Sequence, residues 1–347
     1  MKAPLKITSI LAAFLAATSA FATTSDVVGY VTFNAPDGAD QKFGIPMTNS
    51  PEAHTISSIS SGTINVSSDP SAATTNHYIQ FTGGTLEGQW FQVTASDSST
   101  VTVAEDLESL GAIADDSFDI VEAWTLSTLF GSDFPVSTDV FSPVAQVLAN
   151  DVTAVGINKS APSNYAYHDG SSGFVGAGWF NVNNPFDTSK DSVILAPNTF
   201  ITIRNQTGSD FDIVIPGAVP NNKLSIAVVA DSSQQNDNLI YNPYPADIQL
   251  SLSDLTSVVA TSTDVFTPTD QIIVYSSTPT GLNPSASSNY AYHDGSSGFV
   301  GAGWFNVNNP FDTSKDTVTI PAGGAFIIRK AAGGSDGYWA GTLPYTL

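Results

Sequence analysis

Apolar and polar residues alternate over short stretches along most of this chain. Apolar residues at helical spacing never continue for more than about two turns. Turn-forming residues separate the alternating stretches, which is typical of short β-strands. In the first part of the chain this pattern predicts strands over residues 27–34, 54–66, 77–81, 89–95, 99–104 and 118–124. Their regular spacing predicts a small barrel or sandwich, and we expect an N-terminal β module over 23–124.

The rest of the chain contains an internal repeat. Residues 163–191 recur without a change as 288–316, an offset of 125 positions. The same offset aligns 137–141 with 262–266 and Arg204 with Arg329. Repetition of one structural unit is the simplest source of such self-similarity. We therefore expect two β repeats, 125–222 and 246–347, joined by a connector, 223–245, that holds one strand at 224–230.

Composition supports an all-β fold, with tandem small sandwich or barrel modules and an internal duplication. Val, Ile, Thr and aromatic residues, which favour strands, are abundant, whereas Lys and Arg number only 10. The 32 acidic residues give a net charge of −22. A charge of this sign repels nucleic acid and anionic membrane surfaces. Because the chain has no cysteine, disulfides cannot stabilise it.

The N-terminus has the layout of a secretory signal. Lys2 and Lys6 precede or flank the start of an apolar run, 7–17, and Ala20-Phe21-Ala22 matches an A-x-A cleavage site. This predicts a signal peptide at 1–22. No later stretch reaches the roughly 18 apolar residues that a membrane-spanning helix needs. We expect a secreted protein without a transmembrane segment, either extracellular or at the cell surface, with the periplasm as an alternative.

The repeated segment is the first candidate for a binding site. Residues 169–173 predict a turn between two strands, and a hairpin centred on Ser171 pairs residues whose numbers add to 342. Tyr165, Tyr167 and Trp179 then share one face. Aromatic rings stack on the apolar faces of sugars, so this face is a candidate carbohydrate platform. The alternative, which we favour, is that these rings belong to the core. The candidate ligand-binding residues are Tyr165, Tyr167, His168 and Trp179 with their copies Tyr290, Tyr292, His293 and Trp304.

Metal binding is a second possibility for the same segment. His168 and His293 are each followed by Asp, but no second histidine lies near either, so a turn-flanking histidine bonded to its neighbouring Asp is the favoured interpretation. Oxygen ligands gather just beyond, which suits Ca²⁺. Asn and Asp also favour turns for local reasons. The candidate calcium ligands are Asn181, Asn183, Asp187 and Asp191 with their copies Asn306, Asn308, Asp312 and Asp316.

Enzyme motifs are scarce. The chain has no G-x-S-x-G, no H-E-x-x-H and no phosphate-binding loop. A pair of carboxylates for glycan hydrolysis stays open, because the spatial distance between acids is invisible in a sequence. We expect a protein that is not an enzyme.

Several glycine and aromatic stretches resemble a conserved family of uncharacterised secreted proteins found in bacteria of the Verrucomicrobia type. The stretches are 27–32, 81–84 with 88–93, and 124–131. A member of this family would resemble it over nearly the whole mature chain. The resemblance implies export and a β-rich body, and it assigns no activity or site residues.

Together these features favour a secreted, non-enzymatic structural or adhesin-like protein of the extracellular space or cell surface. The alternative is a secreted carbohydrate-binding protein that uses the repeated aromatic residues. Expected partners are extracellular polysaccharide or further copies of the chain, with strand addition at 345–347 as one route to assembly. Apart from the candidate Ca²⁺, no cofactor is expected.

Overall fold

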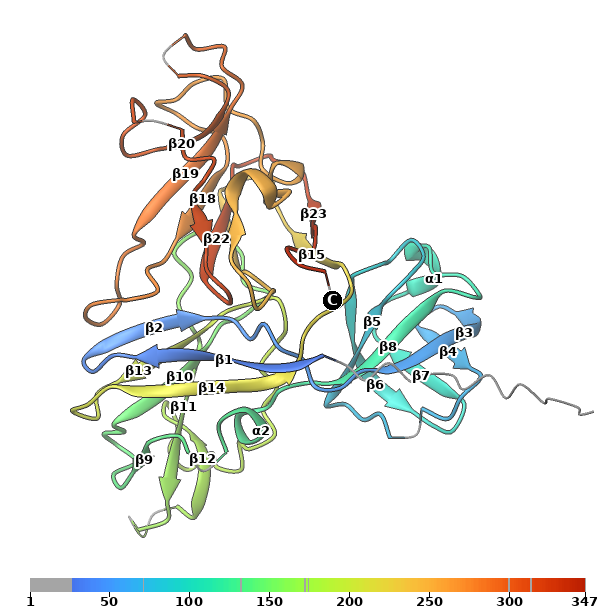
Figure 1. Ribbon diagram of the computed structural model, residues 1–347. Coiled ribbons are helices and arrows are strands. Elements are labelled where there is room, and N and C mark those ends of the chain that lie inside the picture. Colours follow the sequence, from blue (N-terminus) through green and yellow to red (C-terminus); the bar gives the residue numbers. More distant parts are fainter. Residues whose placement is uncertain are drawn as a thin grey trace, which may run out of the picture.

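The structure is a computed structural model that describes residues 27–346 except 71, 132, 172, 174, 299 and 313. The predicted signal peptide therefore lies outside the described residues. The expected all-β fold is confirmed, with several sheets and one closed six-stranded barrel. Figure 1 shows three bodies: the barrel on the right, a β body below and a second β body above. Within the described residues, no helix is long and apolar enough to cross a membrane.

The barrel occupies the first predicted module. Its strands close in the order β3-β4-β7-β6-β5-β8, and a short helix, α1 (Leu107–Leu110), covers one end. Ile64, Phe81 and Phe118 fill its interior. Because Glu52 at its start pairs with Ile120 near its end, the two chain ends of the barrel lie side by side. The strands are β3 (Glu52–Ser60), β4 (Thr63–Val66), β5 (His77–Phe81), β6 (Trp90–Ser96), β7 (Thr100–Val103) and β8 (Ser117–Glu122).

The first repeat is built on a sheet with the order β12-β11-β10-β13-β2, to which β9 adds in parallel. A separate two-stranded ribbon, β1-β14, packs over it, and the helix α2 (Leu126–Phe130) enters the same core. The strands are β1 (Val28–Ala35), β2 (Ala39–Phe43), β9 (Val136–Ser137), β10 (Ala145–Ala149), β11 (Ser163–Asp169), β12 (Ala177–Asn181), β13 (Ile201–Asn205) and β14 (Phe211–Ala218).

The second repeat has the same plan. Its main sheet has the order β16-β22-β18-β19-β20, and its ribbon is β15-β23. Two 3-10 turns (Leu250–Leu252 and Leu255–Ser257) occupy the place of α2. The strands are β15 (Leu224–Val228), β16 (Asn236–Tyr241), β17 (Ile248–Gln249), β18 (Gln271–Val274), β19 (Ser288–His293), β20 (Gly303–Asn306), β21 (Thr319–Ile320), β22 (Ala325–Lys330) and β23 (Gly337–Gly341).

The module boundaries expected from the sequence need correction at two places. The hairpin β1-β2 belongs to the first repeat, because β1 pairs with β14 and β2 with β13. The hairpin β15-β16 is likewise part of the second repeat and not a connector. The barrel is therefore an insertion that interrupts the first repeat after its opening hairpin. The two hairpins differ in sequence and stand at a different offset from the rest of the repeat, so the alignment at 125 positions missed them.

The two repeats contact each other by exchanging equivalent loops, 150–162 and 275–287. In the first repeat Arg204 donates from Nε and Nη2 to Asp40, both at 2.8 Å. The backbone N–H of Asn283, from the loop of the second repeat, donates to the same carboxylate at 2.8 Å. The Asn283 side chain accepts a bond from Arg204 at 3.1 Å.

The second half of the exchange repeats this geometry with the roles of the repeats reversed. Arg329 donates to Asp237 at 2.7 and 2.9 Å, and the backbone N–H of Asn158 donates to Asp237 at 2.8 Å. Asn158 and Asn283 are equivalent positions, and both have left-handed backbones, with φ of 53° and 48°. Asparagine tolerates this region better than most residues. The repeats thus form a pseudo-twofold pair inside one chain.

Candidate functional site: the outer tips of the two repeats

The repeated segment forms the outer end of each repeat, and its central hairpin differs in register from the prediction. Tyr167 pairs with Trp179 and His168 with Gly178, so paired residue numbers add to 346, not 342. The hairpin is centred on Gly173 because the turn runs on beyond Gly170, which has a φ of 84°. Since the shift is an even number of residues, the predicted faces survive, with Tyr165, Tyr167 and Trp179 on one side. Phe174 lies outside the described residues.

The predicted aromatic face points into the core. Trp179 and Trp304 are each 1% exposed. Trp179 contacts the rings of Tyr167, Phe130 and Phe134, with centroids 5.7, 5.6 and 5.0 Å away. These two tryptophans therefore present no face on which a sugar could stack.

The tyrosines of the same face pack in the same cores as the tryptophans. Tyr165 and Tyr167 are partly buried against the first core, and Tyr292 has the same position against the second. Tyr290 is 7% exposed. These residues thus belong to the core, as the favoured interpretation predicted, and do not form the alternative carbohydrate platform, because the inner face of the hairpin is covered by the ribbon and α2 or its counterpart.

Both histidines are buried, and each one accepts a hydrogen bond from the backbone of the turn that follows it. His168 accepts a hydrogen bond at Nδ1 from the Gly170 N–H at 2.7 Å, and its Nε2 lies 3.3 Å from the Thr138 carbonyl oxygen. His293 has the same pair of contacts at the same distances. This arrangement fits a neutral ring with the proton on Nε2. The neighbouring Asp lies 3.8 Å away in each case, too far for the predicted hydrogen bond.

The predicted calcium ligands make contacts within the loop that follows. The Asn181 and Asn306 side chains accept backbone N–H bonds from Asn183 and Asn308, each at 2.9 Å. Asp316 accepts the backbone N–H of Trp304 at 2.9 Å, and its counterpart Asp191 lies beside Gly178. Within the described part of the chain, no group of three or more His, Asp or Glu side chains is placed to hold a metal ion. Calcium binding by this loop stays a prediction.

Asp187 and Asp312 have a different role. Asp187 accepts from Lys190 at 2.7 Å, and Asp312 from Lys315 at 2.6 Å. Each pair closes the loop immediately after an exposed phenylalanine. Such a half-exposed pair contributes little to global stability, and it links two side chains three positions apart in this loop.

The most unusual feature of the tips is a pair of exposed phenylalanines in each repeat, which the sequence patterns did not single out. Phe141 and Phe186 are 60% and 65% exposed, and their counterparts Phe266 and Phe311 are 56% and 64% exposed. In the second repeat the two rings meet edge to face, with centroids 5.9 Å apart. Large apolar side chains that gather in contact at a surface commonly mark an interaction site.

Short hydrogen-bonded turns hold these phenylalanines outward. The Phe141 N–H donates to Asp139 and the Phe266 N–H to Asp264, both at 2.9 Å. Hydrogen bonds from the Thr267 hydroxyl and from the Phe266 N–H lower the pKa of Asp264. The carboxylate is thus charged and bonded at neutral pH, which keeps the turn formed.

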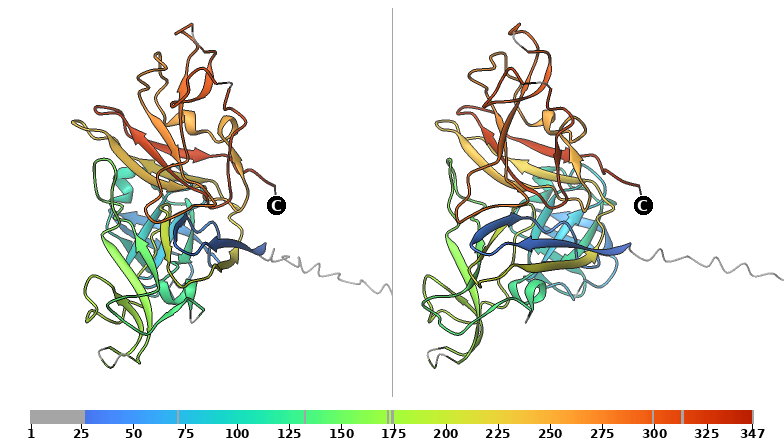
Figure 2. Two further views of the ribbon diagram at one scale, coloured as in Figure 1. Left: turned by 90° about the vertical axis from the view of Figure 1, so that its left-hand side faces the viewer. Right: turned by 60° about the vertical axis from the view of Figure 1, so that its left-hand side comes forward.

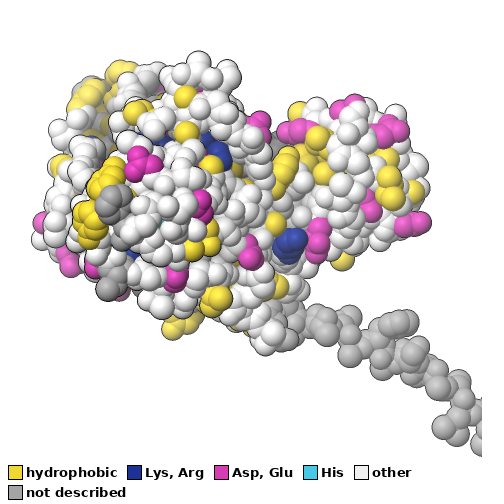
Figure 3. Space-filling model, turned by 90° about the horizontal axis from the view of Figure 1, so that it is seen from above, with side chains coloured by type: hydrophobic (Ala, Val, Ile, Leu, Met, Phe, Trp, Pro, Cys, Tyr) yellow, Lys and Arg dark blue, Asp and Glu magenta, His cyan; other side chains and the backbone are white. Residues whose placement is uncertain are grey.

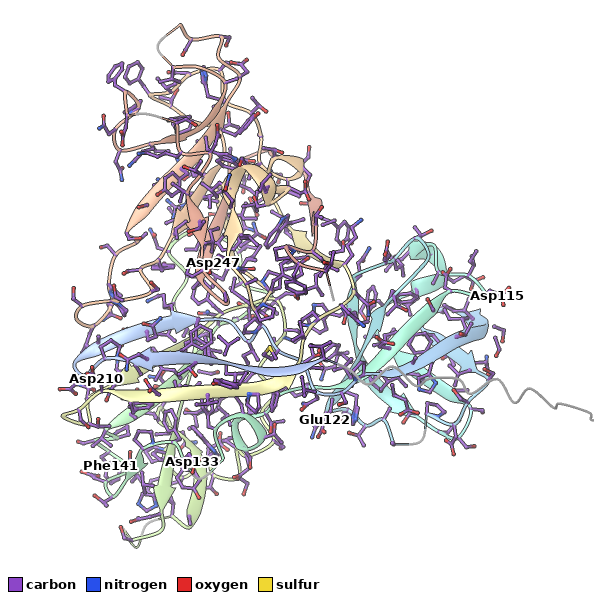
Figure 4. The ribbon with its side chains drawn as sticks, viewed as in Figure 1. Asp115, Glu122, Asp133, Phe141, Asp210 and Asp247 are labelled. Atoms are coloured by element: carbon purple, nitrogen blue, oxygen red, sulfur yellow. The ribbon has the colours of Figure 1, made fainter. Side chains whose placement is uncertain are left out.

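The two tips lie at opposite ends of the molecule. The views of Figures 1 and 2 agree that the β19-β20 end points up and the β11-β12 end points down, away from the contact between the repeats. Phe141 lies in the lower body in Figure 4, beside the place of β9 in Figure 1. Figure 3 looks onto the upper repeat and shows apolar side chains gathered at one margin, while acidic side chains are scattered over the surface.

Comparison of the chain with protein-family models, with curated proteins and with solved structures gave no match. The resemblance to a secreted bacterial family therefore stays a prediction, as does the absence of enzymatic activity.

Proposed function

We propose that this protein is a secreted, non-enzymatic structural protein that assembles end to end through its two tips. The observation that carries the proposal is the pair of exposed phenylalanines found at the same place on both tips. Each molecule then has two equivalent apolar patches at opposite ends. A patch that binds its own copy links such molecules into chains. Export rests on the predicted signal at 1–22.

A comparison between the repeats supports a role for the tip surface. Outside the tips even buried positions differ: Ala145 corresponds to Asp270 and Asn205 to Lys330, all four being buried. Within the tips the exposed Phe186 and Phe311 are the same, as is every residue of 163–191 and 288–316. The shared fold alone does not require this identity, since surface positions usually tolerate change; a functional constraint on the tip surface explains it, and a recent copying of this segment is the alternative.

The ion pairs fit the same role. The patch around Phe186 carries the acid Asp187 and the base Lys190 side by side. When two copies of this patch meet around a twofold axis, each acid can face the partner's base, so the contact is complementary in charge. The net charge of −22 opposes association at low ionic strength, and salt weakens that repulsion.

The proposal is tested by sedimentation velocity of residues 23–347 over a range of protein and salt concentrations. Wild type is expected to form chains that lengthen with concentration and with added salt. Phe266→Ser with Phe311→Ser leaves one working tip, so this variant stops at dimers. Adding Phe141→Ser and Phe186→Ser leaves a monomer.

Ile113→Ser is the matched control, because Ile113 is 63% exposed but lies on the barrel. It should assemble like wild type. End-to-end assembly would be disproved by a wild-type protein that stays monomeric at every protein and salt concentration. It would also be disproved if the variant with all four Phe→Ser substitutions still formed chains of molecules.

A further inference from the structure

The cleft where the three bodies meet is independent of the tips. It has a volume of about 350 Å³. The barrel contributes Trp90, the first repeat contributes 151–155, Lys159 and 197–199, and the second contributes residues of β15 and β16. Clefts of roughly 300 Å³ or more, formed between domains, are common sites for small ligands.

One wall of the cleft is held by satisfied polar groups. Asp237 is 0% exposed and is bound by Arg329 and by the Asn158 N–H. The Asn238 side chain accepts the Val229 N–H at 2.8 Å and donates to the Val229 carbonyl at 3.0 Å. Because these groups already make hydrogen bonds within the protein, they form the wall of the cleft, and a ligand would be bound by other groups.

Three other groups lining the cleft keep unused hydrogen-bonding capacity. No carboxylate of the described residues lies within 4.0 Å of the Lys159 ammonium, which is half-buried. The side-chain amide of Asn198 and the Trp90 indole N–H likewise have no hydrogen-bond partner among the described residues. Beside them, the Thr199 hydroxyl is buried and has no hydrogen-bond partner in the part of the chain that the structure describes.

The charge balance of the cleft singles out Lys159. Burial lowers the pKa of Lys159, and the carboxylates of Asp237 and Asp151 oppose this shift. The charge of Asp237 is already compensated by Arg329, and Asp151 bonds the Thr153 N–H and hydroxyl. The ammonium therefore lacks a close counter-ion, which a ligand carboxylate would supply.

We propose that this cleft binds a carboxylated sugar, a single hexuronate unit of a short acidic oligosaccharide. Trp90 offers a partly exposed ring for the apolar face of the sugar, with Tyr78 behind it at a centroid distance of 5.8 Å. The Asn198 amide serves the ring hydroxyls, and Lys159 binds the carboxylate. The repeated Tyr and Trp of the tips take no part.

The pseudo-symmetric cleft provides an internal comparison. It lies between β1-β2 and the second repeat and has a volume of about 240 Å³. Its lysine, Lys42, is held over the ring of Tyr275 at 4.8 Å, and no residue of the barrel lines this cleft. The ammonium is thus already engaged and no tryptophan is present, so we expect one sugar site in each chain.

The test is titration calorimetry of residues 23–347 with short oligogalacturonates, with the matching neutral oligosaccharide and with inorganic phosphate. Wild type should bind the acidic oligosaccharide with a stoichiometry of one and bind the other two at least tenfold more weakly. Lys159→Gln should weaken acidic binding about tenfold or more, since it removes a charge-assisted bond. Lys223→Gln, at an exposed lysine outside the cleft, should change nothing.

Trp90→Phe keeps a ring at the cleft and should weaken sugar binding less than Lys159→Gln weakens it. Equal binding of phosphate and oligogalacturonate would identify a plain anion site and overturn the proposal. Absence of oligogalacturonate binding, or binding that Lys159→Gln leaves intact in a folded protein, would also overturn it. The phenylalanine variants of the tips should bind normally, so this test and the assembly test succeed or fail separately.

Discussion

At the contact between the repeats, burial and hydrogen bonding shift the pKa of the same carboxyl group in opposite directions. Asp40 is 1% exposed, and burial by itself would raise its pKa. Hydrogen bonds from Arg204 and from the Asn283 N–H outweigh burial, so the pKa of Asp40 lies below its ordinary value of 3.8. The charged form is therefore favoured by folding, and this carboxylate links loop, strand and neighbouring repeat.

The low pKa of Asp40 predicts a pH-dependent contribution to stability. This contribution is complete above pH 3.8, the ordinary value, and is lost as the pH falls through the lower folded-state pKa. Asp40→Asn should lower the free energy of unfolding by about 3 kcal/mol at pH 7. The gap between variant and wild type should shrink below pH 4, as measured by urea denaturation from pH 7 to pH 2. The exposed Asp212→Asn is the control, and a gap independent of pH would contradict the assignment.

A second buried residue pair distinguishes the two repeats. Lys330 donates to Asp270 at 2.5 Å and to the Val258 carbonyl at 2.6 Å. The first repeat has Asn205 and Ala145 at the equivalent positions, so the same part of its core is packed without an ion pair. Removing one member of a buried pair leaves an uncompensated charge, whereas removing both need not destabilise.

Lys330→Asn alone should therefore lower the free energy of unfolding by about 3–5 kcal/mol. The double variant Lys330→Asn with Asp270→Ala, which copies the first repeat, should recover at least half of that loss. Chemical denaturation of the two single variants and the double variant forms a mutant cycle. Strictly additive losses would show that the two side chains are not coupled.

At the scale of elements, sequence alternation located the strands of the first part of the chain to within about two residues, except that the predicted 54–66 is two strands, β3 and β4. The predicted strand 77–81 coincides with β5, and 118–124 overlaps β8. The hairpin register was wrong because glycines extended the turn, and glycine permits several turn lengths. The exposed phenylalanines were missed because alternation cannot distinguish an apolar residue of the core from one in a loop that turns outward.

The ends of β2 and β16 meet where no side chain fits. The backbone of Gly44 lies against the Tyr241 ring, and a Cβ placed there would be 1.8 Å from a ring carbon. The Tyr241 hydroxyl donates to the Ile45 carbonyl at 3.0 Å, which holds the ring in place. The close approach of the two repeats depends on this glycine.

Gly44→Ala should consequently destabilise the protein by more than about 2 kcal/mol, because the ring has to leave its position. Gly176→Ala is a suitable control, since nothing lies within 4 Å of its Cβ position and its φ is not in the left-handed region. Thermal denaturation of both variants gives the comparison. Equal melting temperatures for the two would show that the β2 and β16 ends are not tightly packed.

At the scale of the whole molecule, the sequence predicted the duplication but not its interruption. Repetition at a constant offset is visible in a sequence, whereas pairing of β1 with β14 joins segments about 180 residues apart and leaves no local pattern. The cleft between the three bodies was equally hidden, because Trp90, Lys159 and Asn198 come from separate parts of the chain.

The barrel should fold when expressed alone as residues 50–124. Its strands close on themselves, its core is its own, and its chain ends are adjacent. These are the properties of an inserted domain. Dispersed amide signals in a proton–nitrogen correlation spectrum, with one cooperative thermal transition, would support this expectation. A spectrum typical of an unfolded chain would show that the barrel depends on the repeats.

The interruption of the first repeat also sets an order of events during folding. The second repeat can close its sheets between residues 224 and 341, whereas Val28 has to find Ala218 on the far side of the barrel. Contacts that close a longer stretch of chain form more slowly, since more entropy is lost before they stabilise anything. β1, which precedes the barrel in the chain, is thus among the last strands to find its place, and β14 has no partner strand until it does.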